Sequence, residues 1–119
     1  MFTNLGKVIH WVSDMAKAKA FYTGALGLKV TSDFGDWVEL GTQGATLCLH
    51  GGAKKPNPAA EATAKTVTGI QVSDLKKAMA VLAERGVKPN GKPHQIHGTI
   101  HVISISDPDG NLIDISGPL

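Results

Sequence analysis

The chain has 119 residues, of which 42% are hydrophobic and 18% charged, a composition typical of one globular domain rather than of a disordered or fibrous chain. The formal net charge is only +2, and the basic residues are scattered and include one arginine, Arg85, which argues against binding to nucleic acid. No apolar run approaches the roughly 20 residues that cross a bilayer, and the lone Cys48 cannot form an internal disulfide, so we expect a cytoplasmic protein that does not contact membranes.

The first half of the chain is predicted to begin with a strand that leads into a helix. Residues 8–12 have an extended pattern, and the Ser-Asp pair at 13–14 has the residue types that cap helix N-termini. The helix carries one apolar stripe, which Gly27 ends: Met15, Ala18, Tyr22 and Leu26. The rest of this half is expected to be extended, in three segments: 28–30, 36–40 and 44–51.

An internal repeat organises the chain. Residues 12–20 match residues 72–80 at six of nine positions, an offset of 60 residues, and each copy marks a strand end followed by a capped helix. The second helix has its own apolar stripe, which ends before Gly86: Leu75, Ala78, Met79 and Leu82. The last strands of the two halves also correspond, with residues 44–51 lying over residues 110–117.

Each half therefore has the order strand, helix, strand, strand, strand. In the second half a β-branched strand at 99–106 leads into the turn signal at 107–111. We expect a single domain, 1–119, with one βαβββ module at about 1–52, a linker at about 53–63 and a second module at about 64–119. Neither half alone buries its sheet, so the halves must curl around a common cavity, within one chain or by exchange between two chains.

Four segments, spread over most of the chain, carry a resemblance to a known family. They are Val8 to Met15, Ala20-Phe21-Tyr22 with Leu26-Gly27-Leu28, Trp37 to Leu40, and Asp107 to Asp114. They resemble the opening and closing motifs of the vicinal oxygen chelate superfamily, which includes glyoxalases, bleomycin-resistance proteins and ring-cleaving dioxygenases. The resemblance implies an α+β fold of two βαβββ modules that form a cupped, barrel-like mixed sheet with the helices outside. It also implies a ligand in the cup and a homodimer.

Metal-dependent members of that family bind their ion through four cup-facing positions. Carried over by resemblance, these positions are Lys7, Cys48, Val67 and Asp114. Only Asp114 is a conventional carboxylate ligand, because a protonated lysine and a valine have no lone pair to offer. We therefore expect no metal at the standard family site, and no cofactor.

Strand alternation from an inward Lys7 predicts which other side chains line the cup, since residues two apart share a face. The expected ligand-binding residues share this inward direction: Lys7, Trp11, Cys48, His50, Gln71, Ser104 and Asp114. The mixture of an indole with a few polar groups fits a small organic ligand that has a flat apolar part. For Lys7 two arrangements stay open, an ion pair with Asp114 or extension into solvent.

The histidines divide into groups with different expected roles. His10 shares a face with Val8 and Val12 and is expected to be a hydrogen-bonded core or interface histidine. His50 shares a face with Cys48 and either contacts ligand, with a pKa suited to a general base, or is exposed at a strand end. A third group lies after Gly91 and Pro93 and is expected in a loop at the rim of the cup and the strand that follows, with a non-standard metal site as the alternative: His94, His97 and His101. No catalytic residue is assigned.

Two functions of different classes remain. The first is a protein of the bleomycin-resistance type that sequesters a small organic molecule without the standard family metal. The second is a metal-dependent enzyme of the family, such as a glyoxalase-like lyase, an isomerase, a dioxygenase or a thiol transferase of the fosfomycin-resistance type. The ligand positions favour the first, because the metal histidines that the resemblance requires are absent at Lys7 and Val67.

Overall fold

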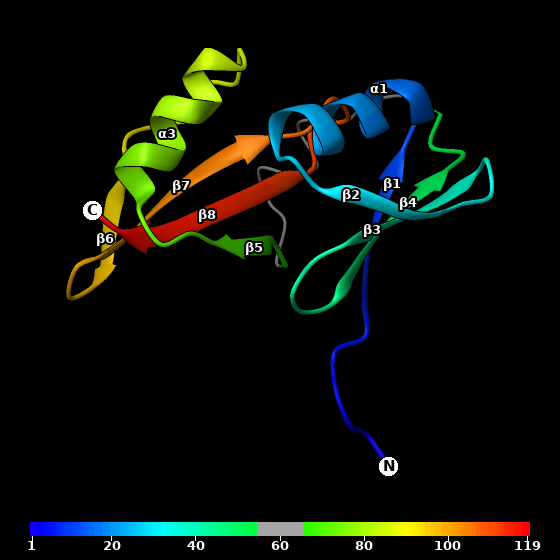
Figure 1. Ribbon diagram of the computed structural model, residues 1–119, viewed down its shortest axis with the longest axis horizontal. Coiled ribbons are helices and arrows are strands. Elements are labelled where there is room, and N and C mark those ends of the chain that lie inside the picture. Colours follow the sequence, from blue (N-terminus) through cyan, green and yellow to red (C-terminus); the bar gives the residue numbers. More distant parts are fainter. Residues whose placement is uncertain (55–65) are drawn as a thin grey trace.

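The computed structural model describes residues 1–54 and 66–119, so most of the expected linker lies outside the described residues. The elements, in chain order, are β1 (Lys7–Val12), α1 (Met15–Ala20), η1 (Phe21–Ala25), β2 (Lys29–Asp33), β3 (Trp37–Gly41), β4 (Thr46–Gly51), β5 (Thr68–Gln71), α3 (Leu75–Glu84), β6 (His94–His97), β7 (Ile100–Ser106) and β8 (Leu112–Pro118). Figure 1 shows two modules side by side, with α1 beside the first sheet and α3 beside the second. No helix within the described ranges is long and apolar enough to span a membrane.

Each module contains one four-stranded mixed sheet. The strand order is β1-β4-β3-β2 in the first sheet and β5-β8-β7-β6 in the second, with the first and last strands of each module parallel and the other pairs antiparallel. The expected α+β fold of two βαβββ modules is confirmed. The two sheets do not close into one barrel, however, because β1 and β5 are edge strands and pair only within their own sheets.

Both helices begin as the repeat predicts. The carboxylate of Asp14 accepts a hydrogen bond from the Lys17 amide at 3.1 Å, and that of Asp74 accepts one from the Lys77 amide at 2.9 Å. The first helix departs from α geometry in its last part, η1, where the Leu26 amide reaches back five residues to the Phe21 carbonyl. Such a wider, π-helical turn is often found at functional sites.

The prediction from the sequence was wrong for one segment, 94–97, which contains two of the clustered histidines. Residues expected in a loop form the short edge strand β6, which pairs antiparallel with β7 and is exposed along its whole length. This strand lacks the usual sequence signal, because it has no buried face and therefore no alternation of apolar and polar residues. Pro93 and the polar side chains instead favour the prediction of a loop. Gly98 has φ 54° in the turn that joins β6 to β7, a backbone conformation that glycine adopts without strain.

The core lies on the helix-facing side of both sheets. On β3 and β4 it contains Val38, Leu40, Leu47 and Leu49, and on β7 and β8 it contains Ile103, Ile105, Ile113 and Ile115. Their partners on the helices include Tyr22 and Leu75, both completely buried. One continuous apolar cluster therefore spans the two modules, and burial of such side chains contributes roughly 1.5–3 kcal/mol each.

Buried polar side chains also join the modules. The Tyr22 hydroxyl donates to Asp107 Oδ2 at 2.8 Å, so its oxygen must accept from His10 Nδ1, which lies 2.6 Å away. In the neutral imidazole, Nε2 then accepts from the Thr68 hydroxyl at 2.7 Å. The predicted role of His10 as a hydrogen-bonded interface histidine is confirmed, since it is 7% exposed and bonds to both modules.

Replacing Tyr22 by Phe should destabilise the protein by about 1–3 kcal/mol, because it leaves buried polar groups of His10 and Asp107 without the hydroxyl they share. Urea unfolding followed by circular dichroism measures the change. The matched control is Thr23→Ala, which removes an exposed hydroxyl bonded to the Lys19 carbonyl and should change stability by less than about 0.5 kcal/mol. We call the hydrogen bonds that link Asp107, Tyr22, His10 and Thr68 the tie between the modules. Equal stability of Tyr22→Phe and the parent chain would contradict a stabilising role for this tie.

Candidate functional site

The candidate site begins on the face of the first sheet that α1 does not cover. Alternate residues of β1, β3 and β4 point away from the core: Lys7, Ile9, Trp11, Trp37, Glu39, Thr46, Cys48 and His50. Two of these are large apolar side chains with high exposure, Ile9 at 47% and Trp11 at 55%. These exposed apolar side chains on an uncovered sheet face make it the candidate site.

An aromatic cluster lies at one end of this face. The ring of Trp11 stacks on that of His50, with centroids 3.9 Å apart and an interplanar angle of 21°. Trp37 meets the same imidazole edge-on at 5.5 Å and 83°. The strand register explains the cluster, because His50 on β4 is the partner of Trp11 on β1 and of Trp37 on β3.

A charged pair lies next to the aromatic cluster. Lys7 Nζ is 3.3 Å from Glu39 Oε2, and the same oxygen accepts a hydrogen bond from Trp37 Nε1 at 3.0 Å. The indole hydrogen bond and then that of Lys7 hold the pKa of Glu39 below its ordinary value. The face therefore carries a carboxylate that stays ionised to lower pH than a free glutamate.

Cys48 lies in the middle of the face, between Ile9 and Glu39 in the strand register. Its side chain is completely buried, and burial, followed by the charge of Glu39, raises the pKa of the thiol. A raised pKa keeps sulfur in the thiol form, which is a poor nucleophile and a poor metal ligand.

The open face of the second sheet is polar by comparison. Gln71 on β5 pairs in register with Ser116 on β8, and the Ser104 hydroxyl on β7 donates a hydrogen bond to the Asp114 carboxylate on β8. Asp114 is the register partner of Gly69, just as Cys48 is the partner of Ile9. The two modules thus place Cys48 and Asp114 at equivalent positions.

The predicted site residues divide between the two faces. Lys7, Trp11, Cys48 and His50 lie together on the first sheet, and Gln71, Ser104 and Asp114 lie on the second. The alternative ion pair between Lys7 and Asp114 is not formed, because Lys7 pairs with Glu39 and Asp114 accepts from Ser104.

Sequence reasoning missed two residues of the site, Trp37 and Glu39. The signal was present in the alternation of Trp37-Val38-Glu39-Leu40, in which Val38 and Leu40 are core residues. Once these two face the core, the tryptophan and the glutamate must face the other way.

The family's metal positions do not suit a metal in this chain. Lys7 is paired with a carboxylate, Val67 is a partly exposed apolar residue before β5, and Cys48 is a buried thiol with a raised pKa. Within the described ranges, no three His, Cys, Asp or Glu side chains gather in a way that would hold an ion, and this includes the histidines of β6 and β7. The donor chemistry at these positions supplies one carboxylate only.

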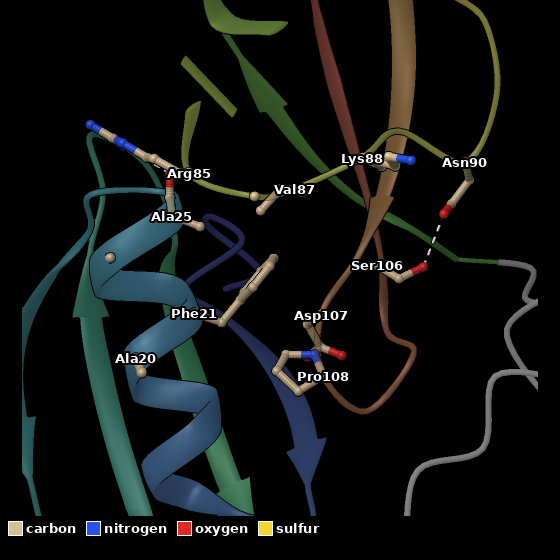
Figure 2. A pocket seen from close by; sticks show the side chains of 12 residues that line it. Ala20, Phe21, Ala25, Arg85, Val87, Lys88, Asn90, Ser106, Asp107 and Pro108 are labelled. Carbon is tan, nitrogen blue, oxygen red and sulfur yellow. Dashed lines mark hydrogen bonds between the residues drawn. The ribbon is translucent and has the colours of Figure 1, made fainter. Parts of the chain in front are cut away.

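A separate hollow lies away from the open sheet faces. A cleft of about 670 Å³ runs between η1, the segment that follows α3 and the turn between β7 and β8, on the helix side of the sheets (Figure 2). None of the residues predicted for the site lines it.

The pKa of Glu39 provides a test of the charged pair. We expect a carbon-13 titration of the side-chain carboxyl to give a value below that of an ordinary glutamate, and both Trp37→Phe and Lys7→Met to raise it. Because the pKa is lowered by folding, the contribution of the pair to stability is present at neutral pH and is lost as pH falls through that lowered value. Lys19→Met, which removes the other described ion pair, with Asp33, should leave Glu39 unchanged. An unaltered Glu39 pKa in Trp37→Phe would contradict the assignment.

Comparisons with known proteins agree with the fold. Residues 4–115 match the model of the Glyoxalase/Bleomycin resistance protein/Dioxygenase superfamily. The chain is 30% identical to the uncharacterized protein YraH of Bacillus subtilis, over 87% of this chain and 90% of that one. A glyoxalase/bleomycin resistance protein/dioxygenase from Nocardioides has the same fold, with a TM-score of 0.76 and 18% identity over 100% of this chain and 85% of that one. A glyoxalase/dioxygenase from Nostoc punctiforme likewise has a TM-score of 0.76, with 22% identity over 97% and 90% of the two chains. The chain therefore belongs to the glyoxalase/bleomycin resistance protein/dioxygenase superfamily.

Proposed function

We propose that the protein binds a small, flat aromatic molecule on the open sheet faces and sequesters it without the metal chemistry of the family. The observation that carries the proposal is the exposure of Trp11. Its indole is 55% exposed although one ring face is stacked on His50. A rigid indole held in place on one side and open on the other is suited to stack against an aromatic ring.

Polar groups beside the indole favour a ligand that also has hydrogen-bonding groups. His50 Nδ1 lies 2.7 Å from the Gly51 carbonyl, and because a carbonyl only accepts, Nδ1 carries the hydrogen. In the neutral ring Nε2 is then an acceptor. Glu39 and Lys7 add a second acceptor and a donor on the same face. A ligand with a ring and one or two hydrogen-bonding groups at its edge matches this set.

A second copy of the chain completes the site in this proposal. Within one chain the sheets stay separate, with β1 and β5 as edge strands, and Ile9, Trp11 and Val67 are left exposed at 37% or more. Edge strands and exposed apolar side chains are surfaces that proteins normally cover. A homodimer that brings the aromatic face of one copy opposite the polar face of the other would cover them and form a cup.

The donor set argues against the alternative of a metal-dependent enzyme. Lewis-acid catalysis needs several oxygen, nitrogen or sulfur ligands on one ion, and the family positions supply Asp114 alone. The carboxylate of Asp114 is also engaged by the Ser104 hydroxyl. Binding of an intact molecule requires none of this chemistry.

A thermal-shift screen of aromatic metabolites and antibiotics tests ligand binding, because a bound ligand raises apparent stability by mass action. Each hit is then titrated by tryptophan fluorescence. Trp11→Ala should weaken binding about tenfold, through lost stacking and lost apolar contact. Ile96→Ala removes an equally exposed apolar side chain from β6 and should change nothing. Hits that bind Trp11→Ala with the affinity of the parent chain would refute the role of the indole.

Sedimentation equilibrium tests the second copy. The expected mass is twice the 12.4 kDa of the chain. Ile9→Asp places a charge on the face that would be covered and should shift the equilibrium toward monomer. Phe34→Asp changes a more exposed residue in the turn between β2 and β3 and should leave the dimer intact. A monomer at high protein concentration would rule out the shared cup.

A further inference from the structure

The cleft on the helix side of the molecule has the size and construction of a second small-molecule site. Its volume of about 670 Å³ lies within the range of roughly 300–1,000 Å³ that small-molecule pockets occupy. Both modules contribute walls, the first through η1 and the second through the segment after α3 and the turn between β7 and β8 (Figure 2).

The cleft stays open because the first helix has a π-helical turn and small side chains at this point. Gly24 and Ala25 line it from the π-helical turn, and a Cβ placed on Gly24 would meet no atom within 4 Å. A surface hollow of this volume has room for another molecule.

The charges around the cleft favour an anion. Arg85 and Lys88 are the basic residues of the lining, and within the described residues neither forms an ion pair with an acidic side chain. Asp107 is the acidic residue of the lining, but it is 5% exposed. Its two oxygens accept hydrogen bonds from Tyr22, from both nitrogens of Asn111 and from the Asp109 amide. These donors engage the carboxylate of Asp107, and among the described residues the basic side chains of the rim have no acidic side chain as an ion-pair partner.

The floor and sides of the cleft are apolar. Figure 2 shows the ring of Phe21 directed toward Val87 across the cleft, with Pro108 on the turn nearby and Lys88 and Asn90 along the far side. The side-chain amide of Asn90 donates one hydrogen to Ser106 Oγ at 3.0 Å, which leaves its second hydrogen for another acceptor. An aromatic wall thus faces a rim of donors.

We propose that this cleft binds a small aromatic carboxylate, with its ring between Phe21 and Val87 and its carboxylate at Lys88 and Asn90. The site is separate from the open sheet faces, since it lies on the opposite, helix side and shares no residue with them. It also adjoins the tie between the modules, because Asp107 both lines the cleft and accepts the Tyr22 hydrogen bond.

Titration of nitrogen-15-labelled protein with benzoate tests the proposal. Amide signals of residues 21–25, 86–88, 90, 106 and 107 should shift and saturate at millimolar benzoate. Benzamide, which has the ring without the charge, should bind about tenfold more weakly. Lys88→Glu should weaken benzoate binding by about tenfold or more for the same reason. Lys76→Glu makes the same change at an exposed position of α3 outside the cleft and should leave the affinity unchanged.

Gly24→Leu gives a second test. A Cβ at this position would meet no atom within 4 Å, and leucine is a better helix former than glycine, so the protein should remain folded. The rest of the side chain should then occupy the cleft and abolish benzoate binding. Trp11→Ala should leave benzoate binding unchanged, which separates this site from the proposed cup. The proposal fails if benzoate causes no saturable shift at the cleft, if its effect persists in Gly24→Leu and Lys88→Glu, or if it disappears in Trp11→Ala.

Discussion

The arrangement of this protein depends on a buried carboxylate at the junction of its two modules. Asp107 accepts two backbone amides of its own turn, which shape the β7–β8 connection, and its other oxygen holds the Tyr22 hydroxyl of the first module. A buried charge is tolerated only when it is fully hydrogen-bonded, so each donor constrains the position of the others. The series of hydrogen bonds continues from the Tyr22 hydroxyl through His10 to Thr68 at the start of β5. Helix, first strand and second module are thereby fixed relative to one another, and the apolar cluster packs around this tie.

The position of the core determines which sheet faces remain open. The core packs on the helix sides of both sheets, so the alternate side chains of β1, β3 and β4 are left on an open face. There the short contacts are made among the site residues themselves, as between Trp11 and His50. The cleft near Phe21 arises on the other side, where the π-helical turn and Gly24 leave the junction incompletely filled.

Much of the fold could be predicted from the sequence, because the features that define it are local and repeated. The Ser-Asp caps, the apolar stripes and the offset of 60 residues identify two equivalent modules, and the register later placed Cys48 and Asp114 at matching positions. The repeat predicts a strand between the second helix and residue 99, but the position of β6 was missed because an exposed strand has no apolar alternation. The pairing of Lys7 with Glu39 was missed because it depends on side chains two strands apart, and sequence spacing does not encode such a distance. The cleft could not be predicted for the same reason, since its walls come from three segments that are far apart in the sequence.

The equivalence of Cys48 and Asp114 has a consequence for how the two halves have diverged. A duplicated module begins as two identical walls, and between identical walls a molecule can lie in either direction with equal energy. Here one wall has a buried thiol and two indoles packed on an imidazole, while the other has a carboxylate that accepts a hydrogen bond from a serine. The approximate twofold symmetry of the backbone is thus broken by side chains alone. Anything held between two such walls has a preferred head and tail.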